Sequence, residues 1–483
     1  MKGPADDTPK LGGRPGQGGP GGSGGRGQHA NGHRAGGEGG ASVQMLRLLP
    51  GELPLLLLFG ALMFANSFAM QISYVSSVSG FLKTGGVNGI WLVWLVNAAV
   101  FLAIAVAQSF VIDRFQRLPL MRVTLVGFAL TFLVLWTMLQ VSAPSWLVFG
   151  LLYVVAEQQW LVFPVVFWVL ANDAMGVSQA KRLFPLLAGW GLMAKFLGLA
   201  FAASAPTFML AWGLDLGHLL LLNGALYVAA TGLLVALRRR AHFRSITRKP
   251  EPPRQALTEG FEFVRSVPSF KYLTLALLAL MVCDTVIEFH FLVVTDATFL
   301  TTESYQTFYG LYRMVAVALA LLLQVFVTNR VLAHMQLKQV LSFQPYVGIT
   351  VLIALLALPG LASAIGALLL FRLVAETFLQ SARSSFQGLV PEERRGRVSL
   401  VMESFVVAAG TAAGALFIGA VIVASAAGTR FDPSLVYLPL ALAAAVFAAF
   451  ACWRMYGVYD ASLLNWRLKR RQRSSASVLD KLL

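Results

Sequence analysis

The chain is poor in charge and in cysteine, and it lacks the short motifs of several enzyme classes. Only 12% of its 483 residues are charged and 57% are hydrophobic, whereas a soluble domain carries about a quarter charged residues. Its two cysteines give neither a disulfide framework nor metal-ligand spacing. It has no Gly-rich phosphate loop ending in Lys-Ser/Thr and no His-Glu-x-x-His. We therefore expect a membrane protein that is not an enzyme and holds no metal or cofactor.

Long apolar runs fill most of the chain between residues 53 and 455. About twelve runs occur, and each is long enough to cross a hydrocarbon core of ~30 Å as a helix. The expected spans are 53–79, 91–112, 122–141, 145–171, 186–210, 217–237, 271–295, 305–328, 340–358, 362–382, 398–426 and 434–455. The sequence therefore predicts an all-α membrane protein with twelve transmembrane helices.

Basic residues fall almost entirely on one side of this pattern. Of the 38 Lys and Arg residues, 33 lie in the even-numbered breaks, in the two tails or at the span ends next to them (Arg122, Lys271 and Arg454), and the odd-numbered breaks hold only Lys83 and Arg430. Positive charge stays in the cytoplasm during insertion, so both termini are predicted to be cytoplasmic. The net charge of +16 is spread over these segments, which favours contact with anionic lipid over binding of nucleic acid.

The longest break divides the spans six plus six. It carries Arg238-Arg239-Arg240 and the helix-breaking run Lys249-Pro250-Glu251-Pro252-Pro253. The N-terminal segment is rich in Gly and has no apolar face, so we expect it to be disordered. The expected parts are a cytoplasmic tail (1–45), a six-helix bundle (46–237), a cytoplasmic linker (238–270), a second six-helix bundle (271–456) and a basic cytoplasmic tail (457–483).

This layout resembles the major facilitator superfamily, whose two six-helix halves are related by an axis along the membrane normal. After the second expected span, the run Asp113-Arg114-Phe115-Gln116-Arg117 resembles the superfamily's loop signature, with Ser109 in place of its opening Gly. A plain basic turn is the alternative interpretation. The resemblance implies a secondary transporter that works by alternating access, with Asp113, Arg114 and Arg117 as gating residues.

A more specific resemblance lies between the fourth and fifth expected spans. Phe167-Trp168-Val169-Leu170-Ala171-Asn172 is followed, eight residues after Asn172, by Ala180-Lys181-Arg182-Leu183-Phe184-Pro185. Both runs are similar to linked motifs of the ATP/ADP translocases of plastids and intracellular bacteria. The resemblance implies nucleotide exchange, with Asn172 as a substrate contact and Lys181 and Arg182 in gating. In place of that family's charged first-span cluster the chain has Asn66, a further candidate contact.

Ionisable residues inside the expected spans are few, and such residues usually face a cavity because charge in lipid is costly. Arg and Lys are natural partners of phosphate or carboxylate. Asp284 and Glu288 share one helix face, which suits cation coupling or a static pairing with Arg313 or Lys195. The candidate substrate residues are Lys195, Arg313, Arg372 and Glu157, and the candidate coupling or gating residues are Asp284, Glu288, Glu376 and Glu403. The alternative is that these cations are simply buried against carboxylates.

Two interpretations of the cargo remain open at this point. The first is an anionic small molecule, foremost a nucleotide exchanged for another nucleotide across a bacterial cytoplasmic membrane. The second is a small metabolite or drug carried by a proton-coupled facilitator or exporter. We expect a monomer in the lipid bilayer in either case.

Overall fold

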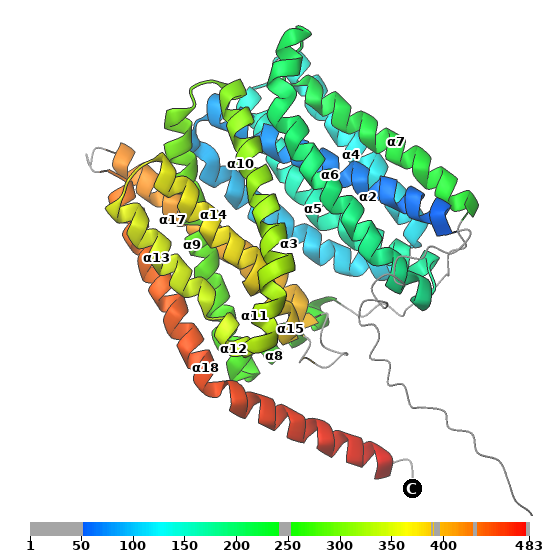
Figure 1. Ribbon diagram of the computed structural model, residues 1–483, viewed down its shortest axis with the longest axis vertical. Helices are drawn as coiled ribbons and strands as arrows, with labels where there is room; N and C mark the ends of the chain where they lie inside the picture. Colours follow the sequence, from blue (N-terminus) through cyan, green and yellow to red (C-terminus); the bar gives the residue numbers. More distant parts are fainter. Residues whose placement is uncertain (1–51, 241–252, 388–389, 391–396, 428–431, 480–483) are drawn as a thin grey trace, which may run out of the picture. The chain divides into compact units, whose positions relative to one another are not determined.

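The computed structural model (Figure 1) describes residues 52–240, 253–387, 390, 397–427 and 432–479. All of them belong to one compact unit, Leu48–Leu483. The expected N-terminal tail 1–45 and most of the expected linker's first half lie outside the described residues. The expected division of the chain into these parts stays a prediction.

Twelve helices in the described part of the chain are long and apolar enough to cross a membrane, so the protein is an integral multi-pass membrane protein. The first six spans are α2 (Glu52–Gly85), α3 (Ile90–Arg114), α4 (Arg117–Gln140), α5 (Ser145–Ala174), α6 (Val177–Ala211) and α7 (His218–Arg240). A short η1 (Val87–Gly89) precedes α3, and α8 (Pro253–Ser266) precedes the seventh span. Each of the twelve predicted spans overlaps one of these helices, which confirms the predicted number.

Three spans of the second half are interrupted by π-helical turns. Its spans are α9 (Pro268–Thr298); α10 (Thr302–Leu323), η2 (Gln324–Thr328) and α11 (Asn329–His334); α12 (Leu337–Val340) and α13 (Phe343–Ala357); α14 (Leu361–Val374), η3 (Ala375–Leu379) and α15 (Gln380–Gln387); η4 (Val401–Phe405) and α17 (Val406–Ala426); and α18 (Ser434–Leu479). Such turns occur often at functional sites.

Local sequence explains where some of these helices begin and end. Gly86 follows α2 with a φ of 76°, a conformation that glycine adopts without a steric cost. Thr301 caps α10, because its side-chain oxygen accepts a hydrogen bond from the Ser304 amide at 3.2 Å. Within the spans the backbone bonds to itself, as lipid requires.

The two halves repeat one packing pattern. The first span, α2, packs on the fourth, fifth and sixth spans, and the seventh, α9, packs on the tenth, eleventh and twelfth. Between the halves, α3 packs on α17 and α6 packs on α10. These are contacts of the second span with the eleventh and of the fifth with the eighth, so each is the equivalent of the other in the opposite half. Figure 1 accordingly shows α3 and α10 between a group containing α2, α4 and α7 and a group containing α9, α13 and α18.

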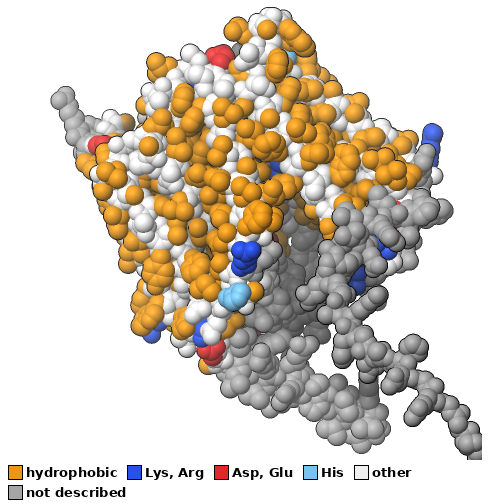
Figure 2. All heavy atoms as spheres, in the orientation of Figure 1, with side chains coloured by type: hydrophobic (Ala, Val, Ile, Leu, Met, Phe, Trp, Pro, Cys, Tyr) orange, Lys and Arg blue, Asp and Glu red, His pale blue; other side chains and the backbone are white. Residues whose placement is uncertain are grey.

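The flanks of the bundle are apolar. Figure 2 shows one face on which hydrophobic side chains cover the described residues almost continuously, with the few charged side chains mainly near the edges. Val123, Leu130 and Val228 are each more than half exposed. Such a large exposed apolar surface fits contact with lipid.

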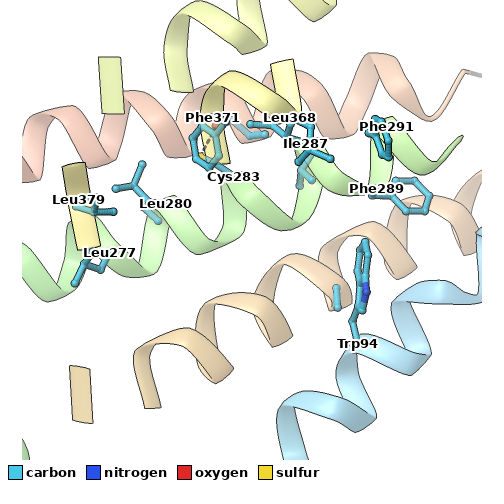
Figure 3. Close-up of a cluster of buried hydrophobic side chains, with 14 of the residues drawn as sticks. Trp94, Leu277, Leu280, Cys283, Ile287, Phe289, Phe291, Leu368, Phe371 and Leu379 are labelled. Carbon is cyan, nitrogen blue, oxygen red and sulfur yellow. Dashed lines mark hydrogen bonds between the residues drawn. The ribbon is translucent and has the colours of Figure 1, made fainter. Parts of the chain in front are cut away.

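The halves meet closely at one end of the bundle, which we call the Gly85 end; the opposite end is the Glu52 end. Lys83 of α2 and Asp296 of α9 form an ion pair of 2.5 Å there. Figure 3 shows Trp94 of α3 pointing toward Phe289 of α9, with ring centroids 6.4 Å apart. On the other side of α9, Cys283 and Ile287 lie near Leu368 and Phe371 of α14 in the core of the second half.

Candidate functional site

A paired arginine lies near the middle of the second half. The guanidinium of Arg372 in α14 donates to both carboxylate oxygens of Asp284 in α9 at 3.2 Å. It also donates to Glu288, one turn further along α9, at 2.6 Å. A static pairing of these two carboxylates with Arg313 or Lys195 was one of the expected alternatives, and burial of the cations against carboxylates was another. The structure pairs both carboxylates with Arg372, because α14 packs directly on α9. One cation therefore serves two carboxylates.

A second arginine lies among tyrosines rather than carboxylates. The guanidinium carbon of Arg313 in α10 is 3.9 Å from the ring centre of Tyr74 in α2 and 6.0 Å from that of Tyr309. The rings of Tyr74 and Tyr309 are nearly parallel, with centres 6.5 Å apart, and Tyr153 of α5 lies 5.5 Å from Tyr74. Arg313 makes no ion pair with any described residue. The stack joins the two halves, since Tyr74 and Arg313 come from different halves.

The two arginines line one small cavity between α10 and α14. Its volume is about 60 Å³, and the polar residues on its wall are Tyr312, Arg313, Arg372 and Glu376. Ligand pockets for drug-sized molecules are roughly 300–1,000 Å³. The cavity holds water-sized molecules in this conformation, so a larger ligand requires the two walls to move apart.

Two further predicted residues bring single charges close to this cavity. Glu157 of α5 lies within electrostatic range of Glu288, Arg313 and Arg372. Lys195 of α6 interacts in the same way with Glu376 and Arg313. Neither Glu157 nor Lys195 forms an ion pair within the described ranges. The structure therefore brings the predicted cations Lys195, Arg313 and Arg372 to the same region between the halves.

Asn66 lies elsewhere, in the interior of the first half. It is buried, and its side-chain oxygen accepts from the Tyr227 hydroxyl at 2.7 Å. Gln159 donates to the same hydroxyl at 2.6 Å, and Asn223 donates to Ser73 at 2.9 Å nearby. This network ties α2, α5 and α7 together, so Asn66 belongs to the packing of the first half and not to the cavity wall.

The motif residues that the two resemblances singled out lie at the Glu52 end. Asn172 is exposed and donates to the Trp168 carbonyl one turn back at 2.8 Å. Arg182 forms a 2.5 Å ion pair with Glu52 and so joins α6 to α2. Lys181, beside it, is exposed. None of these three residues reaches the central cavity.

The loop signature lies at the same end. Arg117 is 3.6 Å from Asp173 of α5, and it is the residue of the signature that joins two spans. Asp113 and Arg114 belong to α3, and their side chains lie outside the described residues. In the second half, Glu403 of η4 lies 3.9 Å from Arg383 of α15. These contacts join helices within one half each.

The sequence did not predict the tyrosines around Arg313 as part of the site. The first span was expected to end at residue 79, which would place Tyr74 close to the membrane surface. The helix α2 runs on to Gly85, which places Tyr74 well inside the bundle. Tyr305 and Tyr309 stand eight and four residues before Arg313. This spacing was the available signal, since residues four apart share a helix face.

Comparison with known proteins supports the fold. No family model and no curated protein matches the sequence. The solved nucleoside transporter NupG matches at a TM-score of 0.57 and 14% identity, over 83% of this chain and 99% of that one. The POT family transporter PepTSo matches at 0.57 and 13%, over 86% and 99%. A bacterial homologue of the iron transporter ferroportin, in an inward-facing state, matches at 0.57 and 17%, over 84% and 99%.

These matches cover almost the whole length of each transporter, and at such low identity they show the shared fold. The chain has the predicted fold: all-α, twelve membrane-spanning helices, two six-helix halves of the major facilitator type. The closer resemblance to ATP/ADP translocases stays a hypothesis, because no family model matches. No group of His, Cys, Asp and Glu that could hold a metal ion occurs among the residues that the structure describes.

Proposed function

We propose that the protein is a secondary transporter that carries an anionic small molecule by alternating access, foremost a nucleotide exchanged for another nucleotide. The observation that carries the proposal is Arg313. Its guanidinium stacks on Tyr74 of the other half and lines a cavity of the second half beside a second arginine, and no described carboxylate forms an ion pair with it. In this fold the substrate binds between the halves near mid-membrane.

The cost of placing a cation in the membrane supports a charged cargo. An arginine at the centre of a spanning helix costs roughly 2.5–3.5 kcal/mol on insertion scales. Stacking on a tyrosine offsets roughly 0.5–2 kcal/mol of this. Arg372 forms ion pairs with Asp284 and Glu288, whereas Arg313 and Lys195 form none with the described residues and have only the longer-range charges of Glu157 and Glu376 near them. An anion bound in the cavity would supply the missing partner, and the guanidinium can receive a phosphate through two parallel hydrogen bonds.

Two features favour a nucleotide among the anions. The motif runs that end at Asn172 and begin at Ala180 resemble those of nucleotide translocases. Beside Arg313, the rings of Tyr74, Tyr153 and Tyr309 provide flat faces of the kind on which bases stack. The cavity of about 60 Å³ would have to widen to admit such a ligand, which requires α10 to move away from α14 and η3.

A second candidate function rests on a different observation. Arg372 is shared by two carboxylates one turn apart, and Glu157 has no ion-pair partner among the described side chains. Protonation of Asp284 or Glu288 would remove one of the two ion pairs that fix the Arg372 side chain. This arrangement favours a proton-coupled facilitator or exporter if the cargo is not a nucleotide.

Binding to the purified protein tests the proposal. We expect labelled ATP and ADP to bind the wild type, and Arg313→Gln to lower the affinity at least tenfold. The matched control is Arg454→Gln on the outer face of α18, where the guanidinium lies over Phe450 and Trp453; its affinity should equal that of the wild type. Equal binding by wild type and Arg313→Gln would overturn the assignment of Arg313, and absence of binding by any anion would overturn the anionic cargo.

A further inference from the structure

The stack of Arg313 on Tyr74 has two properties that a space-filling contact would not need. The guanidinium carbon lies 3.9 Å from the ring centre, which is a face-on approach of the cation to the aromatic ring. The contact also joins the first helix of one half to the second helix of the other. Tyr74 itself is held by ring contacts with Tyr153 at 5.5 Å and Tyr309 at 6.5 Å.

A face-on stack leaves the N–H donors of an arginine to other partners, and for Arg313 the Tyr309 hydroxyl is one of them. The N–H groups of a guanidinium lie in its plane, so a ring above that plane attracts the cation without occupying its hydrogen bonds. An unrestrained arginine side chain carries about 2 kcal/mol of rotamer entropy. A ring that orders the guanidinium beforehand reduces what is lost when an anion binds.

We propose that Tyr74 is a positioning residue for anion binding: its ring holds the Arg313 guanidinium flat, with its donors directed along its own plane to the cavity. This inference rests on the proposed function, because it assigns the anion to Arg313. Arg313 lines the cavity that it shares with Arg372. A phosphate at that place would meet an arginine whose orientation is already set.

The position of the stack between the halves adds a consequence for the transport cycle. The halves are held together beyond Tyr74, toward the Gly85 end, by the hydrogen bond from Ser79 to Gln306 at 3.3 Å and by the Lys83–Asp296 ion pair. When the halves separate there, Tyr74 moves away from Arg313. The ring therefore makes the affinity for the anion differ between the two states, and such a difference is what lets a ligand shift a conformational equilibrium.

Substitutions at Tyr74 separate a positioning role from a packing role. Tyr74→Phe keeps the ring face and should bind ATP within about twofold of the wild type. Tyr74→Leu and Tyr74→Met remove the ring and should lower the affinity about tenfold, the scale of one cation–π contact. Tyr346→Leu, at an exposed tyrosine on α13, is the matched control and should leave the affinity unchanged. Melting temperatures of all variants show which of them fold.

The decisive comparison uses Arg313→Gln as a second background. If Tyr74 acts through Arg313, Tyr74→Leu should cause no additional loss of affinity in Arg313→Gln, because the two changes remove one shared interaction. A ring that only fills space would lower the melting temperature equally in both backgrounds and leave the affinity unchanged. Wild-type affinity in folded Tyr74→Leu and Tyr74→Met, together with a loss in Arg313→Gln, overturns the role of Tyr74 and leaves the proposed function standing. Unchanged affinity in Arg313→Gln contradicts the proposed function itself.

Discussion

Two kinds of cation lie near the middle of the spanning helices, and they differ in their partners. Arg372 is held by Asp284 and Glu288, whereas Arg313 rests on the ring of Tyr74. A paired arginine stabilises two carboxylates that would otherwise repel each other across one helical turn. We therefore infer that Arg372 contributes to the stability of the folded protein through these ion pairs, which Arg313 does not form.

Loss of the Arg372 charge should destabilise the protein. Arg372→Gln leaves Asp284 and Glu288 facing each other without a cation, and breaking a buried pair costs roughly 3 kcal/mol at the lower end of its range; the lower end applies because the Arg372 side chain is 27% exposed. We expect a clear fall in the melting temperature. The triple change Arg372→Gln, Asp284→Asn and Glu288→Gln should restore most of it. If Arg372→Gln melts like Arg454→Gln, the ion pair has no structural role.

The sequence identified the central charges but not their pairing. Lys195, Arg313 and Arg372 could be found because an ionisable residue in an apolar run is costly and therefore informative. The partner of Asp284 and Glu288 depends on how α9 and α14 are rotated about their axes, which is set by tertiary packing. Tyr74 was missed for a local reason, since the end of α2 lies six residues beyond the expected end of the span.

At the scale of helices, the contact between α6 and α10 is unusually close. A methyl group at Gly310 would lie 2.8 Å from the Cβ of Ala203, so only a glycine lets the two backbones approach this far. Across the bundle, Gly419 of α17 lies against the ring of Trp91 in the same way, since a methyl group at Gly419 would lie 2.6 Å from that ring. Glycine at both contacts allows the halves to close at the Gly85 end.

Enlarging Gly310 should therefore disfavour the closed Gly85 end. We expect Gly310→Ala to reduce cross-linking between Lys83→Cys and Asp296→Cys several-fold, measured in a background without Cys283 and Cys452. Gly366→Ala is the control, because a methyl group there meets no atom within 4 Å, and it should leave cross-linking unchanged. Equal cross-linking in the two variants would show that the Gly310 contact does not govern closure.

The existence of the helices was predictable, whereas their interruptions were not. Hydrophobic length is a local property of the sequence, so all twelve spans could be identified from it. The π-helical turns η2, η3 and η4 all belong to the second half within the described chain, and η3 begins three residues after Arg372. Their positions depend on packing between helices, and no turn residue in the sequence marks them.

At the scale of the whole molecule, the repeated packing of the two halves implies an even number of spans and hence both termini on one side. The distribution of basic residues predicts that this side is the cytoplasm. We expect a reporter that is active only outside the cytoplasm to be silent when fused at Gln255 or Leu483. Fusion after Gly360, between the ninth and tenth spans, should make it active. The reverse pattern would invert the topology.

Nucleotide counterflow in proteoliposomes tests the central claim, transport of an anion between the halves through Arg313. The vesicles are loaded with unlabelled ADP, and uptake of labelled ATP is followed for the wild type, Arg313→Gln and the control Arg454→Gln. We predict uptake that requires internal nucleotide, is lost in Arg313→Gln and persists in Arg454→Gln. ATP uptake that is the same in empty and loaded vesicles, or that survives undiminished in Arg313→Gln, would contradict the account.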